Sequence, residues 1–377
     1  MIDPAFDAAS NRLTIDLAAL VDNWRQMGRL SGKARAAAVL KADAYGIGLE
    51  PAAEALYAAG ARDFFVANAE EGVDLRESVP EGRIYVLAGM WPGNEALFFD
   101  NGLVPIVNSE EQLAVYMAAV GEHGDHPCVL HVDTGMNRLG LTVEEALALA
   151  NDPARPASFS PVLVMSHLAC ADDPSHALNR LQLERFRAVA SAFEGIDASL
   201  ANSAGIHHGP DFHFDLTRPG IAVYGGEALN DVANPMTPVV TAEARILQIR
   251  MAKAQDSASY GATAVLSRDT RIATVAIGYA DGYHRSLSGS GVPLRRAVQA
   301  GGHGFVNGYH VPILGRVTMD LCLFDVTDLP ENAVRAGDYV ELFGHNVALD
   351  DTARAAGTIG YELLTGLGNR YERLYID

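Results

Sequence analysis

Short apolar runs alternate with longer amphipathic stretches between about residues 34 and 225. This rhythm is typical of repeated βα units that form a parallel sheet. The predicted strands are Ala36–Lys41, Asp63–Asn68, Arg83–Ala88, Leu103–Val107, Cys128–Asp133, Val162–Leu168, Ala198–Ala201 and a run near Phe214–Tyr224. Eight such units in about 200 residues favour a closed (β/α)8 TIM-type barrel, with an open doubly wound sheet as the alternative.

Amphipathic stretches between these runs predict helices, for example Pro51–Ala59, Ser109–Val120 and Leu178–Phe193. Turn-forming residues at 230–238 interrupt the rhythm, and alternating β-branched residues follow. The strands predicted after this interruption are Val239–Arg250, Ile272–Ile277, Met319–Val326 and Tyr339–Phe343. We therefore predict a barrel domain at residues 1–232 and a smaller, mainly β C-terminal domain at residues 233–377.

The composition is that of a globular chain with a marked acidic excess. The 377 residues include 47 acidic and 28 basic ones, for a net charge of −19. Such a charge repels polyanions, so we expect no nucleic acid partner, although a small phosphate-bearing ligand needs only a local site. Three cysteines without CxxC spacing indicate neither a disulfide framework nor a zinc site.

The N-terminal residues lack the basic and apolar regions of a signal peptide, and no apolar run approaches the length of a membrane span. We expect a cytoplasmic protein without a membrane partner or a removed leader. His123, His126 and His131 match no standard metal-ligand spacing, so we predict no metal. Solvated loop positions are the expectation for the first two histidines.

Lys41 lies at the end of the first predicted strand, before a turn of small residues. Barrel enzymes build their sites at this end of the strands, where a desolvated amine of lowered pKa can form imines with carbonyl compounds. A lysine reaching from the rim into solvent is the alternative, and position alone does not separate the two. Other polar residues stand at the ends of later strands: Arg138 soon after the fifth, His167 on the sixth, Asn202 and Ser203 after the seventh, and Arg218 beside the eighth.

The convergence of these residues at one rim of the barrel is stronger evidence for a functional site than the position of Lys41 alone. The loops after the seventh and eighth strands are a recurrent phosphate site in this fold. Ser203 and the backbone at Gly220 and Ile221 lie in those loops. We therefore predict that they bind a phosphate group.

Eight motifs spread over both predicted domains resemble those of alanine racemases. They are Ala38–Gly46 (AVLKADAYG), Val132–Gly140 (VDTGMNRLG), Met165–Asp172, Ala201–Ala204 (ANSA), Arg218–Ile221 (RPGI), Ser259–Gly261 (SYG), Gly278–Gly282 (GYADG) and Gly315–Asp320 (GRVTMD). One motif alone is weak, whereas eight in order across nearly the whole chain are very specific. The resemblance implies an enzyme that interconverts L- and D-alanine with pyridoxal 5'-phosphate (PLP).

The resemblance assigns two proton-transfer groups. Lys41 carries PLP as a Schiff base and acts at one face of the substrate Cα, while Tyr260 acts at the other. In the family this tyrosine comes from the partner subunit, so the resemblance implies a homodimer with shared sites. His167 links the tyrosine to the arginine that matches Arg218.

The resemblance also assigns residues to the ring, the phosphate and the substrate. Arg218 contacts the pyridine nitrogen, where a permanently charged donor keeps the nitrogen neutral and favours racemisation over transamination. Around the cofactor it implies Tyr45, His167, Asn202, Ser203, Gly220, Ile221 and Tyr361, and for the substrate carboxylate Arg138 and Met319. Tyr279, Arg285 and Arg316 match the family's access corridor.

One position departs from the family pattern. Many alanine racemases have a lysine, often carbamylated, two residues before the Asp-Thr-Gly sequence, and its negative charge orients the substrate-binding arginine. Here that position is His131, which cannot carry a carbamate. Arg138 is therefore held otherwise, by a neutral imidazole, a bound anion or another acid.

Three other functions remain open from sequence. A serine or broad-spectrum amino-acid racemase would differ in the volume of its substrate pocket. A non-catalytic PLP-binding protein would resemble the barrel part alone, which the C-terminal motifs oppose. A decarboxylase on the same cofactor barrel fits the Ser259–Gly261 motif and Arg218 less well. Supply of D-alanine for cell walls and catabolism also remain undistinguished.

Overall fold

The computed structural model describes residues 4–153, 158–294, 297–298 and 301–377. The chain forms two compact units, Leu20–Met236 and Met1–Ala19 with Thr237–Asp377. The predicted division assigned residues 1–19 to the barrel. Residues 4–19 lie instead with the C-terminal unit, because the strand β1 (Asn11–Asp16) pairs with β12 (Val240–Ala252) and β22 (Tyr371–Ile376) and buries Leu13 and Ile15.

The first unit is a barrel of parallel strands. In ring order they are β2 (Arg35–Ala36) with β3 (Ala38–Val39), β4 (Asp63–Val66), β5 (Arg83–Val86), β6 (Leu103–Val107), β7 (Cys128–Asp133), β9 (Pro161–Met165), β10 (Asp197–Ser199) and β11 (Leu216–Thr217). The ring closes because β11 pairs with β2, and because Asp215 and Arg218 donate backbone bonds to Ala198 and Ala201. The predicted (β/α)8 barrel is therefore confirmed.

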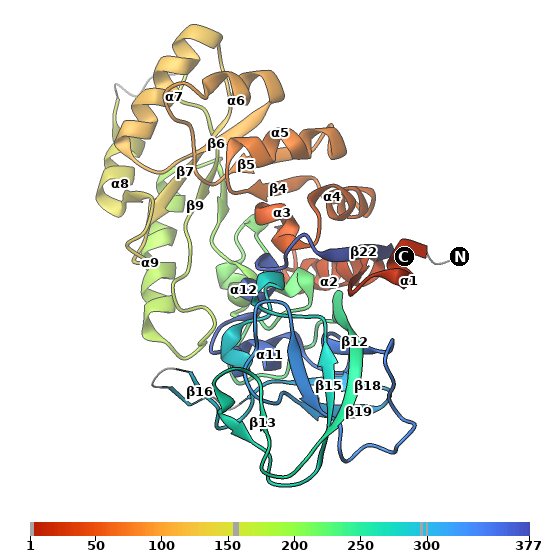
Figure 1. Ribbon diagram of the computed structural model, residues 1–377. Helices are drawn as coiled ribbons and strands as arrows, with labels where there is room; N and C mark the ends of the chain where they lie inside the picture. The colour runs from red at the N-terminus through yellow and green to blue at the C-terminus, as the bar shows by residue number, and fades with distance from the viewer. Residues whose placement is uncertain (1–3, 154–157, 295–296, 299–300) are drawn as a thin grey trace. The chain divides into compact units, whose positions relative to one another are not determined.

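Helices cover the outside of this ring, as Figure 1 shows for α4 to α9. The unit's helices are α2 (Leu17–Leu30), α3 (Lys41–Gly46), α4 (Leu49–Ala58), α5 (Ala69–Ser78), α6 (Glu95–Asn101), α7 (Glu110–His123), α8 (Val143–Asn151), α9 (Ala177–Ala192) and the short α10 (Ser203–Ile206). The short strand β8 (Leu141–Thr142) pairs with β7. Side-chain caps begin α5, α7 and α8, from Asn68, Ser109 and Thr142 respectively.

Two barrel predictions differ from the structure. The last predicted strand, Phe214–Tyr224, is a strand only at Leu216–Thr217, and Ile221–Tyr224 forms a 3-10 helix. Pro219 between them has no N–H to donate, which ends the strand. His126 is buried rather than solvated, and its Nε2 lies 2.6 Å from the Leu103 carbonyl oxygen.

The second unit is built mainly of antiparallel strands. Its main sheet has the order β19 (Tyr309–Pro312), β18 (His303–Val306), β21 (Tyr339–Phe343), β12, β1 and β22, with β15 (Thr270–Val275) pairing β12 and β20 (Cys322–Asp325). Shorter pairs are β13 (Ser257–Ala258) with β14 (Ala264–Val265) and β16 (Pro293–Leu294) with β17 (Ala297–Val298), and the helices are α1 (Pro4–Ala8), α11 (Leu349–Ala356) and α12 (Gly360–Thr365). The predicted mainly β character is confirmed.

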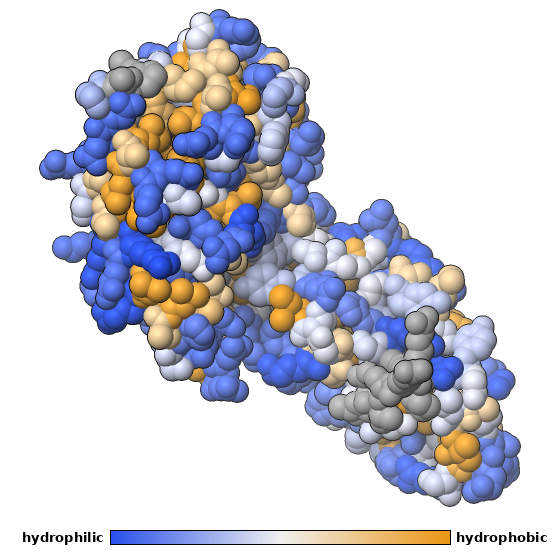
Figure 2. Space-filling model, turned by 90° about the vertical axis from the view of Figure 1, so that its left-hand side faces the viewer, coloured by the Kyte–Doolittle hydropathy of each residue, from blue (hydrophilic) through white to orange (hydrophobic). Residues whose placement is uncertain are grey.

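None of the described helices is both long and apolar enough to cross a bilayer. Figure 2 shows hydrophilic residues interspersed with small apolar patches on the face it presents. Scattered apolar residues of this kind are ordinary on a folded surface.

Candidate active site

Lys41 begins a left-handed turn directly after β3. Leu40 donates its N–H to the Phe65 carbonyl, which ties the end of this strand to β4. The next four residues, 42–45, all have positive φ values between 49° and 57°. This conformation costs about 1–2 kcal/mol for each residue with a Cβ. Lys41 therefore does not end the strand as predicted but opens a strained turn, a feature that concentrates at functional sites.

The amine of Lys41 is suited to nucleophilic chemistry. Burial lowers its pKa, the positive charge of Arg138 lowers it further, and the negative charge of Glu71 raises it. A lowered pKa leaves more of the amine unprotonated at neutral pH. Imine formation with an aldehyde requires this unprotonated amine.

Arg218 is a buried cation, with 5% of its surface exposed. Its Nη2 donates to the Ser166 carbonyl at 2.5 Å and the Leu200 carbonyl at 3.3 Å, and its Nη1 donates to Ser199 Oγ. Burial lowers the pKa of Arg218 to about 9, so it stays protonated at neutral pH. None of the described acidic residues pairs with it. A buried charge without a counter-ion suits a ligand atom that accepts a hydrogen bond.

His131 is buried and stays neutral at pH 7. Burial lowers its pKa to about 4, and the charges of Arg218 and Arg138 add to this effect. Its Nδ1 lies 2.8 Å from Asn108 Oδ1. Asn108 Nδ2 donates to two backbone carbonyls, those of Leu87 and Ile106, which fixes Oδ1 as the atom that faces the histidine. Because Oδ1 only accepts, the histidine proton lies on Nδ1, and Nε2 carries a lone pair.

The residue Asn108 also fixes the loop that carries Arg138. Its carbonyl accepts the Gly140 N–H at 3.1 Å, and Asp133 Oδ1 accepts the N–H groups of Gly135 and Met136 at 2.7 and 2.8 Å. Arg138 itself is exposed and forms no hydrogen bond or ion pair with a described residue. Its guanidinium is thus available for a carboxylate, on a loop whose backbone is held at both ends.

His167 lies close enough to both arginines for their charges to act on it. Burial lowers its pKa well below the ordinary value, and Arg218 and Arg138 lower it further. Its carbonyl accepts the Gln182 amide at 2.9 Å. No hydrogen bond joins the side chains of His167 and Arg218 among the described residues, so the expected link between them is electrostatic in this structure.

The predicted phosphate residues come together at one point. Ser203 Oγ accepts the N–H of Gly220 at 2.8 Å, next to the N-terminus of Ile221–Tyr224. The ring of Tyr45 stacks on Tyr224 with 4.4 Å between centroids. A Cβ on Gly220 would collide with Tyr45 Oη, so this close approach requires glycine.

Asn202 has a different role from the neighbouring Ser203. Its Oδ1 accepts the Gly205 N–H at 2.9 Å and caps α10. It therefore shapes the loop that presents Ser203. The structure thus brings Lys41, Arg138, His167, Arg218 and the phosphate residues to the carboxyl ends of the barrel strands.

The remaining predicted residues lie in the second unit and are exposed. Tyr260 has 73% of its surface exposed, Met319 54% and Tyr361 38%. Ser259, with a φ of 63°, donates from Oγ to the Arg316 carbonyl at 2.8 Å and so fixes the backbone before Tyr260. Tyr260 lies in the 3-10 helix Tyr260–Ala262 and Tyr361 in α12.

Two residues at this site were not predicted from sequence. Asn108 follows β6 directly and Glu71 lies three residues after the cap of α5. The sequence offers a clue to each of them. Asn108 is a polar residue at the end of a strand, and Glu71 is a carboxylate in the first turn of a helix. Some of their backbone partners, however, are distant in sequence, Leu87 and Gly140 for Asn108 and Ala42 for Glu71, and these contacts are visible only in the fold.

Two family models match most of the chain, the alanine racemase N-terminal domain over residues 15–228 and the alanine racemase C-terminal domain over residues 239–375. An alanine racemase of Rhizobium meliloti (strain 1021) is 73% identical over 376 residues, 100% of this chain and 99% of that protein. A biosynthetic alanine racemase of Agrobacterium fabrum (strain C58) is 65% identical over 372 residues, 99% of this chain and 95% of that protein.

A solved structure, that of alanine racemase from Bartonella henselae with covalently bound pyridoxal phosphate, has a TM-score of 0.90 and 36% identity. The match covers 98% of this chain and 100% of that chain. Sequence likeness over the full length and likeness of fold thus agree. This chain belongs to the alanine racemase family.

Proposed function

We propose that this chain interconverts L-alanine and D-alanine with PLP, and that Lys41 and Tyr260 exchange the proton on opposite faces of the substrate Cα. The observation that carries the proposal is that two unusual cations lie at the same end of the barrel. They are Lys41, whose pKa is lowered, and Arg218, which is buried and pairs with no described acidic residue. The C-terminal family match over residues 239–375 opposes the non-catalytic alternative, which lacks that domain.

The residues of the barrel fit PLP. Lys41 offers an amine, Arg218 a buried donor for the ring nitrogen, and Ser203 with the Gly220 and Ile221 backbone a place for the phosphate. Tyr45 adds a hydroxyl at the same place, and the family resemblance also assigns the Tyr361 hydroxyl to the phosphate. When bound, PLP withdraws electrons from the substrate Cα and so eases removal of its proton.

The protein's own groups then bind the substrate and move the proton. Arg138 pairs with the substrate carboxylate through a charge-assisted bond, aided by the Met319 backbone. Lys41 takes or returns the proton on one face and Tyr260 on the other, which inverts the configuration. Arg218, protonated at neutral pH, would donate to the ring nitrogen rather than give it a proton, which would favour return of the proton to Cα over transamination.

Tyr260 reaches a site by belonging to a second copy of the chain. Support comes from its 73% exposure in the single chain. In a homodimer each site would borrow Tyr260 from the partner subunit. We further propose a cytoplasmic location, since PLP and alanine are both available there.

Incubation with L-alanine and PLP in deuterated water tests the function. We expect D-alanine to form with deuterium at Cα. Retention of PLP without either signal would refute racemisation. Tyr260→Phe is expected to reduce exchange from one enantiomer more than from the other, and equal loss from both would contradict the two-base assignment.

Mixing two inactive variants tests the shared site. Lys41→Ala and Tyr260→Ala proteins each lack one proton carrier, so a mixed dimer has one intact site. We expect up to about a quarter of wild-type activity after subunit exchange, as one of the two sites is intact in about half of the dimers. No activity after exchange verified by mass spectrometry would contradict the dimeric site.

A further inference from the structure

Glu71 joins the strained turn after Lys41 to the neighbouring strand end. Its Oε1 accepts the N–H of Ala42 at 2.8 Å, and its Oε2 accepts the N–H of Ala67, just after β4, at 2.7 Å. Asn68 Oδ1 in turn accepts the Glu71 N–H at 2.9 Å as the cap of α5. One carboxylate thus bridges two adjacent strand ends through charge-assisted hydrogen bonds.

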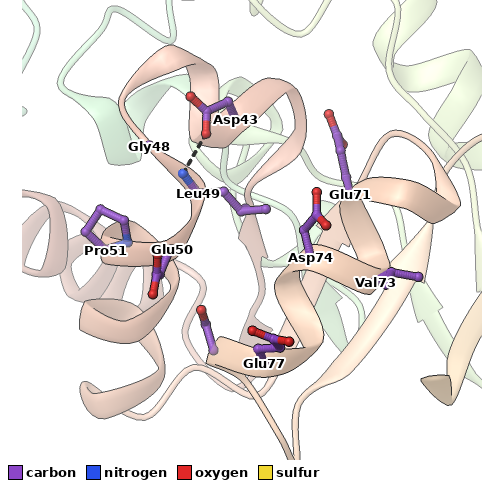
Figure 3. A pocket seen from close by; sticks show the side chains of 10 residues that line it. Asp43, Gly48, Leu49, Glu50, Pro51, Glu71, Val73, Asp74 and Glu77 are labelled. Atoms are coloured by element: carbon purple, nitrogen blue, oxygen red, sulfur yellow. Dashed lines mark hydrogen bonds between the residues drawn. The ribbon is translucent and has the colours of Figure 1, made fainter.

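The far end of the same turn has its own carboxylate contact. Asp43 Oδ1 accepts the Leu49 N–H at 2.7 Å, the bond drawn in Figure 3. Figure 3 also shows Glu71 projecting from α5 beside this turn, in a pocket that both residues line. Between the two contacts lie the residues of positive φ, none of which is glycine until Gly46. An unfavourable backbone of this kind persists only where its surroundings hold it.

The hydrogen bond that Glu71 accepts comes from Ala42, the residue directly after Lys41. Ala42 is exposed and its side chain is a methyl group, so packing does little to hold it. Its N–H belongs to the same peptide unit as the Lys41 carbonyl, and fixing this planar unit fixes the direction in which the Lys41 side chain leaves the backbone. The negative charge of Glu71 also acts on the Lys41 amine, against that of Arg138.

We propose that Glu71 is a positioning residue for Lys41: its carboxylate holds the peptide unit after Lys41 in the left-handed turn and so aims the lysine amine at the substrate Cα. The proposal rests on the racemase function given above. Both oxygens of its carboxylate accept backbone N–H groups, so the proposal gives Glu71 no direct contact with substrate or cofactor. Its loss therefore affects the proton-transfer step more than substrate binding, which depends on the separate Arg138 loop.

Glu71→Gln is the direct test, because the side chain keeps its size while one of its two acceptor atoms becomes a donor facing an N–H group. We expect kcat to fall roughly 10- to 100-fold, as for a small misplacement of a catalytic group, with KM for alanine within about threefold of wild type. Asp74→Asn is the matched control, since Asp74 lines the same pocket on the same helix without either backbone contact. It is expected to leave kcat unchanged.

Hydrogen–deuterium exchange of the holoenzyme without substrate gives a readout that does not depend on turnover. In Glu71→Gln the amides of Ala42 and Ala67 are expected to exchange at least about tenfold faster, with the Arg138 loop unchanged. Glu71→Asp, which keeps the charge but shortens the side chain, is expected to show the same acceleration and a lowered kcat. It also serves if the glutamine variant fails to fold.

Two results would overturn the proposal. One is a wild-type kcat in Glu71→Gln and Glu71→Asp while Lys41→Ala is inactive, which leaves the racemase function intact. The other is an equal fall in kcat for Glu71→Gln and Asp74→Asn, with unchanged hydrogen–deuterium exchange at Ala42 and Ala67. That result would show that the loss of any negative charge on this helix lowers kcat. Failure of the proposed function itself is distinguished by absence of racemisation in the wild type.

Discussion

Replacement of His131 by glutamine tests whether this histidine is neutral in the folded protein. Its folded-state pKa of about 4 lies below the ordinary value of 6.5. The unfolded chain therefore binds more protons than the folded one between these two values, and stability falls as pH falls through this window. More than about one pH unit above 6.5 neither state carries much of the proton, so His131 adds almost no pH dependence there.

The magnitude follows from the difference between the two pKa values. Below pH 4 the full loss of folding stability caused by His131 is about 3 kcal/mol. About 2 kcal/mol of this loss occurs between pH 7 and pH 5. Because glutamine does not titrate, the loss of stability on going from pH 7 to pH 5 should be about 2 kcal/mol smaller in His131→Gln than in wild type. His167, whose pKa is lowered in the same direction, still contributes in both proteins.

Urea unfolding of the holoenzyme at pH 7 and pH 5, with PLP in fixed excess, measures this difference. His345→Gln is the control, since His345 is exposed and its replacement should leave the wild-type pH dependence unchanged. An equal pH dependence in His131→Gln and wild type would refute the neutral imidazole. It would favour the other two ways of holding Arg138, a bound anion or another acid.

Three further changes test separate contacts. Arg138→Ala should raise the KM for alanine roughly 10- to 100-fold by removing a charge-assisted carboxylate contact, and steady-state kinetics with an unchanged KM would contradict it. Gly220→Ala should weaken PLP binding at least about tenfold, measured by equilibrium titration, because the new methyl group meets Tyr45 Oη; wild-type affinity would count against the phosphate assignment. Asp63→Asn should destabilise the barrel by about 3 kcal/mol in urea, since Asp63 is buried between two arginines and accepts the Tyr85 hydroxyl; a loss below about 1 kcal/mol would contradict this.

The barrel strands were predictable because both of their faces are buried. Leu103–Val107 and Cys128–Asp133 have the predicted bounds, and nearly every residue in them is inaccessible to solvent. A short continuous apolar run followed by a helix cap is a strong local signal. The strand Tyr339–Phe343 of the second unit was predicted for the same reason, with four of its five residues buried.

Other features depend on contacts that no local pattern carries. The left-handed turn at 42–45 contains alanine, aspartate and tyrosine, none of which signals positive φ as glycine does. The strand β1 is stabilised by partners more than 200 residues away, β12 and β22. Burial of His126 likewise follows from Phe99, whose ring lies 4.4 Å from the imidazole between centroids. The family resemblance, confirmed by the full-length relatives, assigned the site where spacing alone left Lys41 undecided.

The barrel mouth is cationic although the whole chain has a net charge of −19. Arg138 lowers the pKa of Lys41, and the two arginines both lower the pKa values of His131 and His167, so these groups repel further protons. Keeping the histidines neutral limits the repulsion to three cations. A phosphate and a carboxylate would bring negative charge to this cationic mouth. In the proposed function Arg138 would meet the substrate carboxylate and Arg218 the ring nitrogen, so each of these cations, unpaired with any described acidic residue, would gain a ligand acceptor.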